Sequence, residues 1–184
     1  MIQKPKSPVF ISVDVETTGS QAGLHSMYQI GACLVSDVIR TFTARLVPIS
    51  RHYEMAALTA VGMRLDEVME LGEPASVVMR RFHDWVRHTP GGPDKVFVGF
   101  NAAFDWKFVD WYFLHYVGEN PFGFAPLDIK ALVMGALGCD WFDTKMSRLP
   151  PEVRPDRPLT HDGLDDAVQQ AEIFRKTLEL IRQD

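Results

Sequence analysis

The sequence has few cysteines, no long apolar run and no excess of positive charge. Two of its 184 residues, Cys33 and Cys139, are cysteines, and they do not form a Cys-x-x-Cys pair. Two such thiols are typical of a reducing compartment and argue against a disulfide framework. Residues 1–8 carry two lysines but no apolar segment of a secretory signal, and no apolar run approaches the length of a membrane span. We therefore predict a cytoplasmic protein without a membrane partner.

The charge balance is slightly acidic. Lysine and arginine number 19 and aspartate and glutamate 24, which gives a net charge of −5 at pH 7. This balance argues against a protein that binds nucleic acid by charge alone. It does not exclude a phosphate-bearing substrate, because two bound divalent cations would bring four positive charges. The length, with 46% hydrophobic and 23% charged residues, predicts a single domain over residues 1–184 with a core over about 8–182.

Apolar periodicity and turn residues divide the chain into its elements. The pattern predicts strands over 8–15, 28–35, 38–47 and 95–100, and helices over 53–63, 74–87, 103–116, 129–137 and 164–181. The two-residue link at Ser36 and Asp37 indicates antiparallel pairing, whereas the apolar run at 95–100 is typical of a buried parallel strand. Pro-rich residues 138–160 are predicted to form an ordered surface loop or flap. The order of elements predicts a three-layer α/β fold, with a mixed central sheet flanked by helices.

Two carboxylates lie at the end of the first predicted strand. Asp14 and Glu16 follow apolar residues and precede a Thr-Thr-Gly turn. Residues i and i+2 of a strand point to the same face, so the two side chains are expected to lie side by side. Like charges this close call for a cation, and carboxylate oxygens suit Mg²⁺ or Mn²⁺. A solvated edge pair is the alternative, but α/β sheets bind their ligands at the carboxyl ends of strands.

Two further motifs lie where predicted helices begin. Asp105 is in the first turn of the helix after strand 95–100, beside the positive end of the helix dipole, where we expect it to stay ionised. Asn101 could cap that helix. His161 stands at the entrance of the last helix, and Asp166 lies one turn inside it. Capping explains the acidic residues but not the histidine, which could act as a general base near neutral pH.

In chain order the motifs are Asp-x-Glu-Thr-Thr-Gly at 14–19, Asn-x-x-Phe-Asp at 101–105 and His-x₄-Asp-Ala at 161–167. Together they resemble the DEDD exonuclease superfamily, and more narrowly its histidine-containing branch. That branch includes ribonuclease T, oligoribonuclease and the proofreading subunit of bacterial DNA polymerase III. The resemblance spans nearly the whole chain and implies a ribonuclease H-like fold. It also implies a 3′→5′ exonuclease that hydrolyses phosphodiester bonds and releases nucleoside 5′-monophosphates.

The resemblance implies roles for single residues. Two divalent cations, Mg²⁺ or Mn²⁺, about 4 Å apart, would be bound by four catalytic carboxylates: Asp14, Glu16, Asp105 and Asp166. His161 would take the proton from the attacking water. Six residues are expected to contact the terminal nucleotide: Thr17, Thr18, Leu58, Met63, Asn101 and Phe104. For Leu58, Met63 and Phe104, a place in the apolar core is an equally good interpretation.

The chain departs from the family pattern at two places. Gly163 stands where relatives usually carry alanine, which is expected to loosen the start of the last helix. The stretch Tyr28-Gln29-Ile30-Gly31 carries no acidic residue, whereas many relatives have one before Ile-Gly. Neither departure removes a ligand. Four basic residues of 138–160 could contact phosphates, although a solvated charged loop is the simpler interpretation: Lys145, Arg148, Arg154 and Arg157.

The main hypothesis is a metal-dependent 3′→5′ exonuclease that acts on 3′ ends of single-stranded DNA or RNA. Three alternatives stay open: an RNA-specific trimming enzyme or oligoribonuclease, a catalytically silent nucleic-acid-binding module, and a metal phosphoesterase for small molecules. The complete carboxylate set argues against a silent module, since a binder does not need it. A homodimer is plausible by analogy with ribonuclease T. The sequence does not identify a polymerase or repair partner.

Overall fold

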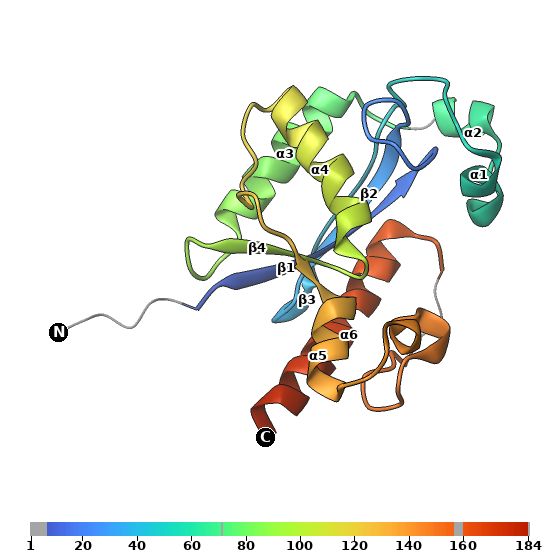
Figure 1. Ribbon diagram of the computed structural model, residues 1–184. Helices are drawn as coiled ribbons and strands as arrows, with labels where there is room; N and C mark the ends of the chain where they lie inside the picture. Colours follow the sequence, from blue (N-terminus) through green and yellow to red (C-terminus); the bar gives the residue numbers. More distant parts are fainter. Residues whose placement is uncertain (1–6, 71, 157–159, 184) are drawn as a thin grey trace.

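A mixed sheet runs through the centre of the molecule (Figure 1). The computed structural model describes residues 7–70, 72–156 and 160–183. Its strands are β1 (Val9–Thr17), β2 (Met27–Leu34), β3 (Asp37–Arg45), β4 (Lys95–Gly99) and β5 (Leu127–Asp128), in the spatial order β3-β2-β1-β4-β5. β1 pairs antiparallel with β2 and parallel with β4, β2 pairs antiparallel with β3, and β4 pairs parallel with β5. The predicted α/β fold with a mixed sheet is confirmed.

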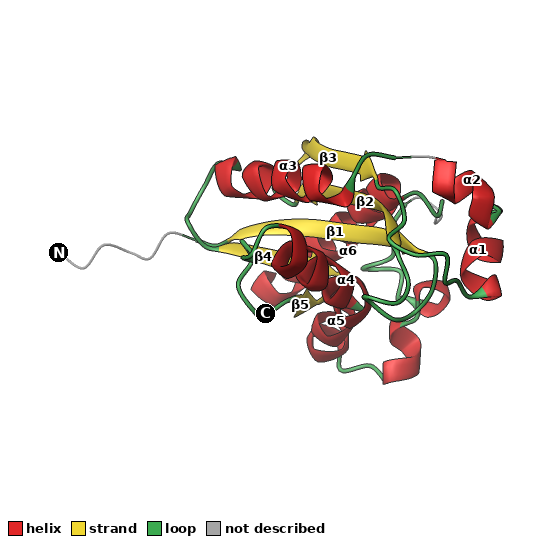
Figure 2. Ribbon diagram, turned by 90° about the horizontal axis from the view of Figure 1, so that it is seen from above, coloured by secondary structure: helices red, strands yellow, loops and turns green. Residues whose placement is uncertain are grey.

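Helices cover both faces of the sheet. They are α1 (Met55–Val61), α2 (Leu65–Glu70), α3 (Ala75–His88), α4 (Ala102–Tyr116), α5 (Ile129–Leu137) and α6 (Gly163–Gln183), with 3₁₀ turns η1 (Trp141–Thr144) and η2 (Met146–Arg148). One face packs against α3 and α4, through side chains such as Phe82 and Phe108, and the other against α5 and α6, through Ile129 and Phe174 (Figure 2). None of the helices in the described part of the chain is long and apolar enough to cross a membrane.

Some expectations about the elements need correction. The sequence pattern did not predict α2 or β5, which have six and two residues. In α3, Val78, Phe82 and Val86 form the buried stripe, whereas Val77 is 47% exposed. Such a stripe follows the i, i+4, i+8 spacing of a helix face.

The segment 138–160 is more than a surface loop. Two of its apolar residues, Leu149 and Val153, are fully buried in the core formed with α5 and α6. The side chain of Arg154 donates to the carbonyl of Leu149 from Nε, 3.1 Å, and from a terminal nitrogen, 2.7 Å. This arginine therefore holds its own segment through two of its three guanidinium nitrogens. Arg157 lies outside the described residues.

Asp128 fixes where two helices begin. It is the N-cap of α5, a position that favours aspartate, and its Oδ1 accepts a hydrogen bond of 2.9 Å from the Ala131 N–H. Its second oxygen, Oδ2, accepts a bond of 2.6 Å from the Ala102 N–H in the first turn of α4. Asn101 makes no side-chain capping bond, so its predicted capping role is wrong. One carboxylate thus ties the starts of α4 and α5 together at the carboxyl edge of the sheet.

The start of α6 lies directly on the backbone of β2. A Cβ atom on Gly31 would lie 2.2 Å from the carbonyl carbon of Gly163 and 2.2 Å from the nitrogen of Leu164. A Cβ on Gly163 would lie 3.2 Å from the nitrogen of Gly31. The expectation that Gly163 loosens the helix start is therefore wrong, because the two glycines allow a close approach. Gly31 is paired with Asp14 across β1 and β2, so this approach brings α6 to the predicted carboxylates.

The Gly31→Ala substitution is predicted to push α6 away from the sheet. Since the new methyl group would meet backbone atoms that cannot rotate away, the free energy of unfolding should fall by about 2–4 kcal/mol. Urea denaturation followed by circular dichroism measures this change.

Gly135→Ala is the matched control for that substitution. Gly135 is exposed inside α5, and a Cβ there would have no neighbour within 4 Å. Alanine should raise the free energy of unfolding by about 0.5–1 kcal/mol, because it restricts the unfolded chain and favours the helix. Equal effects of the two substitutions would contradict the close approach of α6 to β2.

Candidate active site

Asp14 and Glu16 lie at the carboxyl end of β1. Both are half-buried, whereas Val13 and Val15 between them are buried in the core, as the alternation of a strand requires. The pairing with β2 shifts register between Glu16 and Thr17. Such an irregularity ends the regular ladder and can redirect a side chain at a strand end. The sequence therefore predicted the position of this pair correctly.

The turn after Glu16 is held by its own hydroxyl groups. Thr17 donates from Oγ1 to the carbonyl of Gly19, 2.9 Å. Thr18 is fully buried; its Oγ1 donates to the carbonyl of His52 and accepts from the Ser26 N–H, both at 2.9 Å. With no exposed surface, the Thr18 side chain cannot contact a nucleotide in this conformation, so that prediction is corrected.

Asp105 enters the site from the first turn of α4. It is 5% exposed, and its Oδ1 accepts a hydrogen bond of 3.1 Å from the Val15 N–H, between the two carboxylates of β1. Burial raises the pKa of Asp105 to about 7, and the bond from Val15 only partly opposes this effect. Burial therefore opposes the ionised form of Asp105 that the helix dipole is expected to favour.

The start of α6 supplies the remaining predicted groups. Ligand atoms of Glu16, His161 and Asp166 all lie within 4.8 Å of one another. Asp166 is 5% exposed, and its Oδ1 accepts from the N–H and the hydroxyl of Thr160, at 3.1 and 3.3 Å. His161 is exposed on the solvent side of this group. Three segments distant in sequence thus meet at one edge of the sheet (Figure 1).

Gln29 and Asp162 hold the start of α6 on β2. Asp162 accepts from the N–H groups of Leu164 and Asp165, at 3.1 and 3.3 Å, so it caps the helix. Its other oxygen accepts from Nε2 of Gln29, 2.8 Å. Burial acts to raise the pKa of Asp162, but the bonds from Gln29 and the two N–H groups outweigh it and lower the pKa. An acidic residue at position 29 would repel Asp162, which explains why an amide suits this chain.

Sequence reasoning missed Gln170. Its Nε2 donates a short bond of 2.5 Å to Oδ1 of Asp14, and its Oε1 accepts from the Phe100 N–H, 2.9 Å, just past the end of β4. The side chain is 3% exposed. The sequence did contain a sign of its position near the carboxylates, because Gln170 lies four residues after Asp166 and so on the same face of α6. Gln170 therefore orients Asp14 and connects three elements behind the carboxylates.

The electrostatics of the site fit a divalent cation. Burial, followed by the charges of Asp105 and Glu16, raises the pKa of Asp14 well above its usual range. Burial and the nearby charges of Asp166 and Asp105 raise the pKa of Glu16 to about 8. The protein itself therefore supplies little positive charge to stabilise the ionised forms of Asp14 and Glu16. A hard cation with oxygen ligands would supply the missing charge, so the donor set suits Mg²⁺ or Mn²⁺.

Two residues beside the carboxylates have an unusual backbone. Asn101 has φ of 69° and His161 has φ of 55°, and no other non-glycine residue in the described ranges has positive φ. This left-handed conformation costs free energy for residues with a Cβ atom, although asparagine and histidine tolerate it better than most. Both side chains are exposed at the carboxyl edge of the sheet. The local strain therefore coincides with the predicted site.

The other predicted nucleotide contacts lie near the site but are largely packed. Leu58 is 4% exposed in a small core with Tyr28 and Val68. Leu58 and the half-buried Met63 also line a hollow of about 340 Å³ beside α1. Phe104 is half-buried, and Nζ of Lys107 lies 4.4 Å from its ring centroid.

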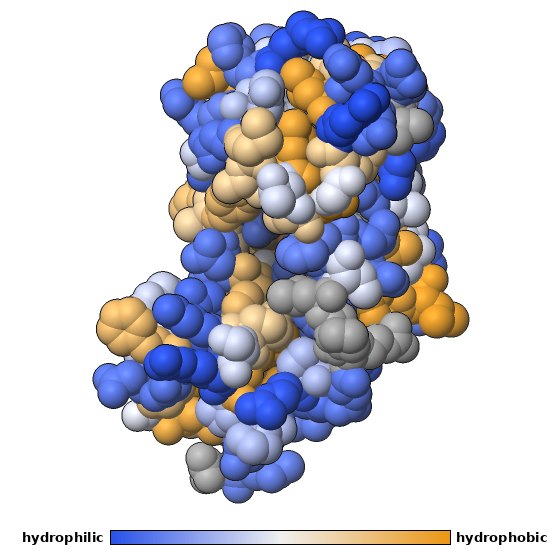
Figure 3. All heavy atoms as spheres, turned by 90° about the vertical axis from the view of Figure 1, so that its right-hand side faces the viewer, coloured by the Kyte–Doolittle hydropathy of each residue, from blue (hydrophilic) through white to orange (hydrophobic). Residues whose placement is uncertain are grey.

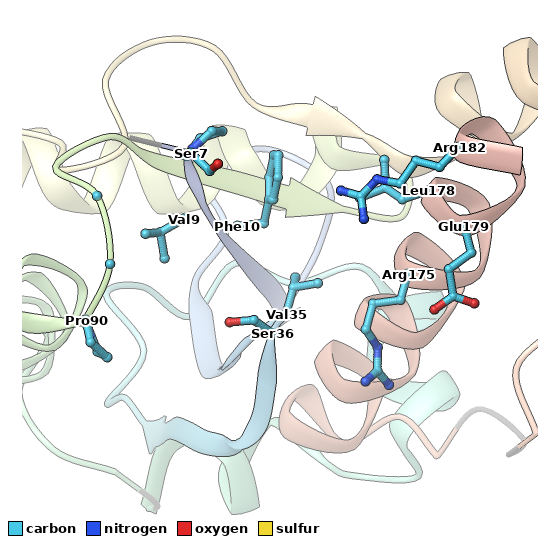
Figure 4. Close-up of a pocket in the computed structure, with 13 residues that line it drawn as sticks. Ser7, Val9, Phe10, Val35, Ser36, Pro90, Arg175, Leu178, Glu179 and Arg182 are labelled. Atoms are coloured by element: carbon cyan, nitrogen blue, oxygen red, sulfur yellow. The ribbon is translucent and has the colours of Figure 1, made fainter. Parts of the chain in front are cut away.

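A larger hollow lies at the opposite end of the sheet. It has a volume of about 440 Å³ and lies at the amino end of β1, between that strand, the loop after α3 and the C-terminal part of α6 (Figure 4). Arg175 and Arg182 line it, with the apolar side chains of Phe10 and Leu178. None of the predicted catalytic residues lines this hollow.

Comparison with known proteins identifies similar sequences and folds. The family model for exonucleases of the RNase T type matches residues 11–174. The 3′-5′ DNA exonuclease Cap18 of Escherichia coli is 40% identical over 168 residues, which cover 91% of this chain and 90% of that protein. The family resemblance inferred from the three motifs is thereby confirmed.

Solved structures agree on the fold. The nuclease domain of 3′hExo, a DEDDh family member bound to rAMP, has a TM-score of 0.71, covers 95% of this chain and 92% of its own, and is 16% identical. Exonuclease I of Escherichia coli, in complex with a dA16 oligonucleotide, has a TM-score of 0.66 and is 14% identical, covering 96% of this chain and 43% of its own. At such identities the similarity concerns the fold alone.

The raised pKa of Glu16 should make the free energy of unfolding depend on pH. The folded pKa of Glu16, about 8, lies above its ordinary value of 4.5, so the folded state binds a proton that the unfolded state releases. The contribution to stability is present below pH about 4.5 and is lost as the pH rises through about 8. In EDTA, the free energy of unfolding should therefore fall between pH 5 and pH 9.

Glu16→Gln should reduce this fall and make the protein more stable than wild type at pH 9 without metal. Urea denaturation at several pH values measures both effects. Glu179→Gln, the same change at an exposed carboxyl, is the control and should leave the wild-type profile unaltered. If Glu16→Gln and wild type give parallel profiles, the raised pKa of Glu16 is wrong.

Proposed function

This chain belongs to the exonuclease family, and from that membership we propose that it degrades single-stranded DNA from the 3′ end and releases nucleoside 5′-monophosphates. Its class is that of a hydrolytic nuclease with 3′→5′ exonuclease activity on nucleic acid. The observation that carries the finer proposal is the convergence of buried and half-buried carboxylates from β1, α4 and α6 beside an exposed histidine.

The carboxylates are proposed to bind two divalent cations, Mg²⁺ or Mn²⁺: Asp14, Glu16, Asp105 and Asp166. When bound, the cations would activate water and stabilise charge on the leaving 3′-oxygen. The protein's own contribution is orientation. Gln170 holds Asp14, the Val15 N–H holds Asp105, and Thr160 holds Asp166, so each of these three carboxylates keeps one oxygen fixed.

His161 is proposed as the general base. Its ring reaches within 4.8 Å of carboxylate oxygens of Glu16 and Asp166, and the residue is exposed. It can therefore accept a proton from water beside these carboxylates and pass it to solvent. The left-handed backbone of His161 turns the chain at the entrance of α6, where the ring is held close to the site.

The terminal nucleotide is proposed to lie between the turn after β1 and the starts of α1 and α4. Five of the six predicted contacts remain in this proposal: Thr17, Leu58, Met63, Asn101 and Phe104. The apolar hollow beside Leu58 and Met63 supports a place for a base. Thr18 instead fixes the turn from the interior.

DNA is preferred over RNA as the proposed substrate because the relative with 40% identity is named a DNA exonuclease. RNA trimming is the second candidate, because the fold is also that of a nuclease crystallised with rAMP. A silent binding module is less consistent with a charge arrangement that favours a cation. A phosphoesterase for small molecules is less consistent with family membership.

Other predictions belong to the same proposal. A single exonuclease domain over residues 1–184 is supported by the family match over 11–174. A cytoplasmic location is supported by the two unpaired thiols, Cys33 and Cys139. A homodimer rests on analogy with ribonuclease T, and a polymerase or repair partner is left undefined.

Incubation with 5′-labelled single-stranded DNA and RNA tests the function. With Mg²⁺ or Mn²⁺, the products should form a ladder that shortens from the 3′ end, and EDTA should abolish it. Asp14→Ala should abolish turnover while the circular dichroism spectrum stays unchanged. Internal cuts, or no cleavage in either metal, would refute the proposal; a ladder on RNA but not on DNA would favour the second candidate.

The role of His161 has its own test. Asparagine tolerates the left-handed backbone but is not a base, so His161→Asn should keep stability and lower the single-turnover rate by about 10²–10⁴-fold. His161→Ala should slow the chemistry in the same way. The acidic side of the pH–rate profile should flatten in both variants. A wild-type rate in either variant would show that another group takes the proton.

A further inference from the structure

Two exposed aromatic side chains beside α5 have no role in the proposed chemistry. Trp141 is 47% exposed and Phe142 is 62% exposed, both in η1. Nζ of Lys130 lies 4.0 Å from the centroid of the Trp141 ring, and Nζ of Lys145 lies 5.4 Å from that of Phe142. We call these four residues the aromatic ledge. It combines exposed rings with positive charge.

The ledge lies at the same edge of the sheet as the carboxylates. Lys130 is the second residue of α5, and Asp128, which caps α5, also accepts from Ala102 at the start of α4. Asp105 lies in that first turn of α4. Trp141 packs on Lys130, so the chain after α5 runs back to the first turn of α5. This end of α5 adjoins the first turn of α4, which carries Asp105.

The space-filling view of this side agrees (Figure 3). Apolar side chains gather in the upper part, where α1 and α2 lie, whereas in the lower part, where the chain after α5 lies, apolar and hydrophilic side chains are mixed. Hydrophilic side chains and a hollowed surface separate the two parts.

The charges of the ledge suit a polyanion. Neither Lys130 nor Lys145 takes part in a salt bridge within the part of the chain that the structure describes. Asp140 and Asp143 belong to the same segment, but they leave both ammonium groups without a carboxylate within 4.0 Å. The ledge therefore carries positive charge in a chain whose net charge is −5.

A similar pair lies next to Asp105. Nζ of Lys107 lies 4.4 Å from the ring centroid of Phe104, in the first turns of α4. A lysine over an aromatic ring thus occurs beside the carboxylates and again on the ledge. Rings and lysines in this combination are how proteins hold single strands without regard to sequence: bases stack on the rings, and phosphates pair with the cations.

We propose that the aromatic ledge binds the single strand several nucleotides to the 5′ side of the cleaved end. Bases stack on the open faces of Trp141 and Phe142, and phosphates contact Lys130 and Lys145. This proposal rests on the proposed function. It extends that function, because the affinity for the substrate would depend on the length of the strand. A strand too short to reach the ledge keeps only its contacts at the carboxylates.

Binding of fluorescent single-stranded DNA tests the ledge directly. The probes are 5′-fluorescein oligothymidylates of 4 and 20 nucleotides, with fluorescence anisotropy in Mg²⁺, on an Asp14→Asn background that prevents degradation. Trp141→Ala with Phe142→Ala should weaken binding of the 20-mer at least about tenfold, because each stacked base contributes a factor of about 5 or more. The loss should be much smaller for the 4-mer.

Two further variants separate stacking and charge from a general loss of structure. Phe142→Leu keeps an apolar side chain but removes the ring, so it should weaken the 20-mer, whereas Trp141→Phe should retain most of the binding. Lys130→Ala with Lys145→Ala should reduce the salt dependence of 20-mer binding, log K against log[salt], by about 1.4, since each phosphate contact on a single strand contributes about 0.7.

Arg175→Ala with Arg182→Ala is the matched control. These residues line the hollow at the far end of the sheet (Figure 4), and neither forms a salt bridge among the residues described. Removing two positive charges there should not alter the salt dependence. If the lysine and the arginine double variants change the salt dependence equally, the proposal that phosphates contact the ledge is overturned.

The ladder experiment keeps the two proposals distinct. If wild type shortens DNA while the Trp141 and Phe142 alanine variant binds both probes like wild type, the ledge is refuted and the exonuclease stands. If wild type gives no ladder but the variant loses 20-mer binding selectively, the ledge is supported and the exonuclease function fails. Equal loss for both probe lengths would also overturn the ledge, because the effect would then lie at the carboxylates.

Discussion

The contact between the backbones of Gly31 and Gly163 is the constraint on which the site depends. It allows α6 to begin directly on β2, at the position that pairs with Asp14. Any side chain on Gly31 would separate helix and strand, and Asp166 and His161 would move away with the helix. Gln29 and Gln170 then fix the helix at two places, through Asp162 and Asp14. The geometry of the site is therefore set by main-chain packing before the charged groups contribute.

The charged groups themselves oppose folding. Asp14, Glu16 and Asp105 are forced together at the edge of the core, where burial and mutual repulsion raise their pKa values. A protein selected only for stability would place apolar or amide side chains there. Under the proposed function, the free energy of cation binding would offset their burial. Stability and metal affinity are consequently linked, and removing charge from the site should improve one while it abolishes the other.

Local patterns predicted much of the fold and part of the site. Alternation along β1 placed Asp14 and Glu16 on one face, and the N-cap at Asp128 set the start of α5. What the sequence did not reveal depends on contacts between distant segments. Gln170 looks like an ordinary helix residue until its bonds to Asp14 and Phe100 are seen. Thr18 looks like a nucleotide contact until its burial is known, and β5 is too short for periodicity to detect.

The hydrogen bond between Gln170 and Asp14 joins residues 156 positions apart. Contacts of such long range form late, because the entropy of closing the loop must be overcome first. During synthesis, β1 leaves the ribosome long before α6, so the growing chain carries Asp14 and Glu16 without Asp166, His161 or Gln170. A nascent chain that ends before α6 therefore lacks part of the proposed site. Under the proposed function, a chain translated only as far as the residues before α6 would have no nuclease activity, with no separate inhibitor required.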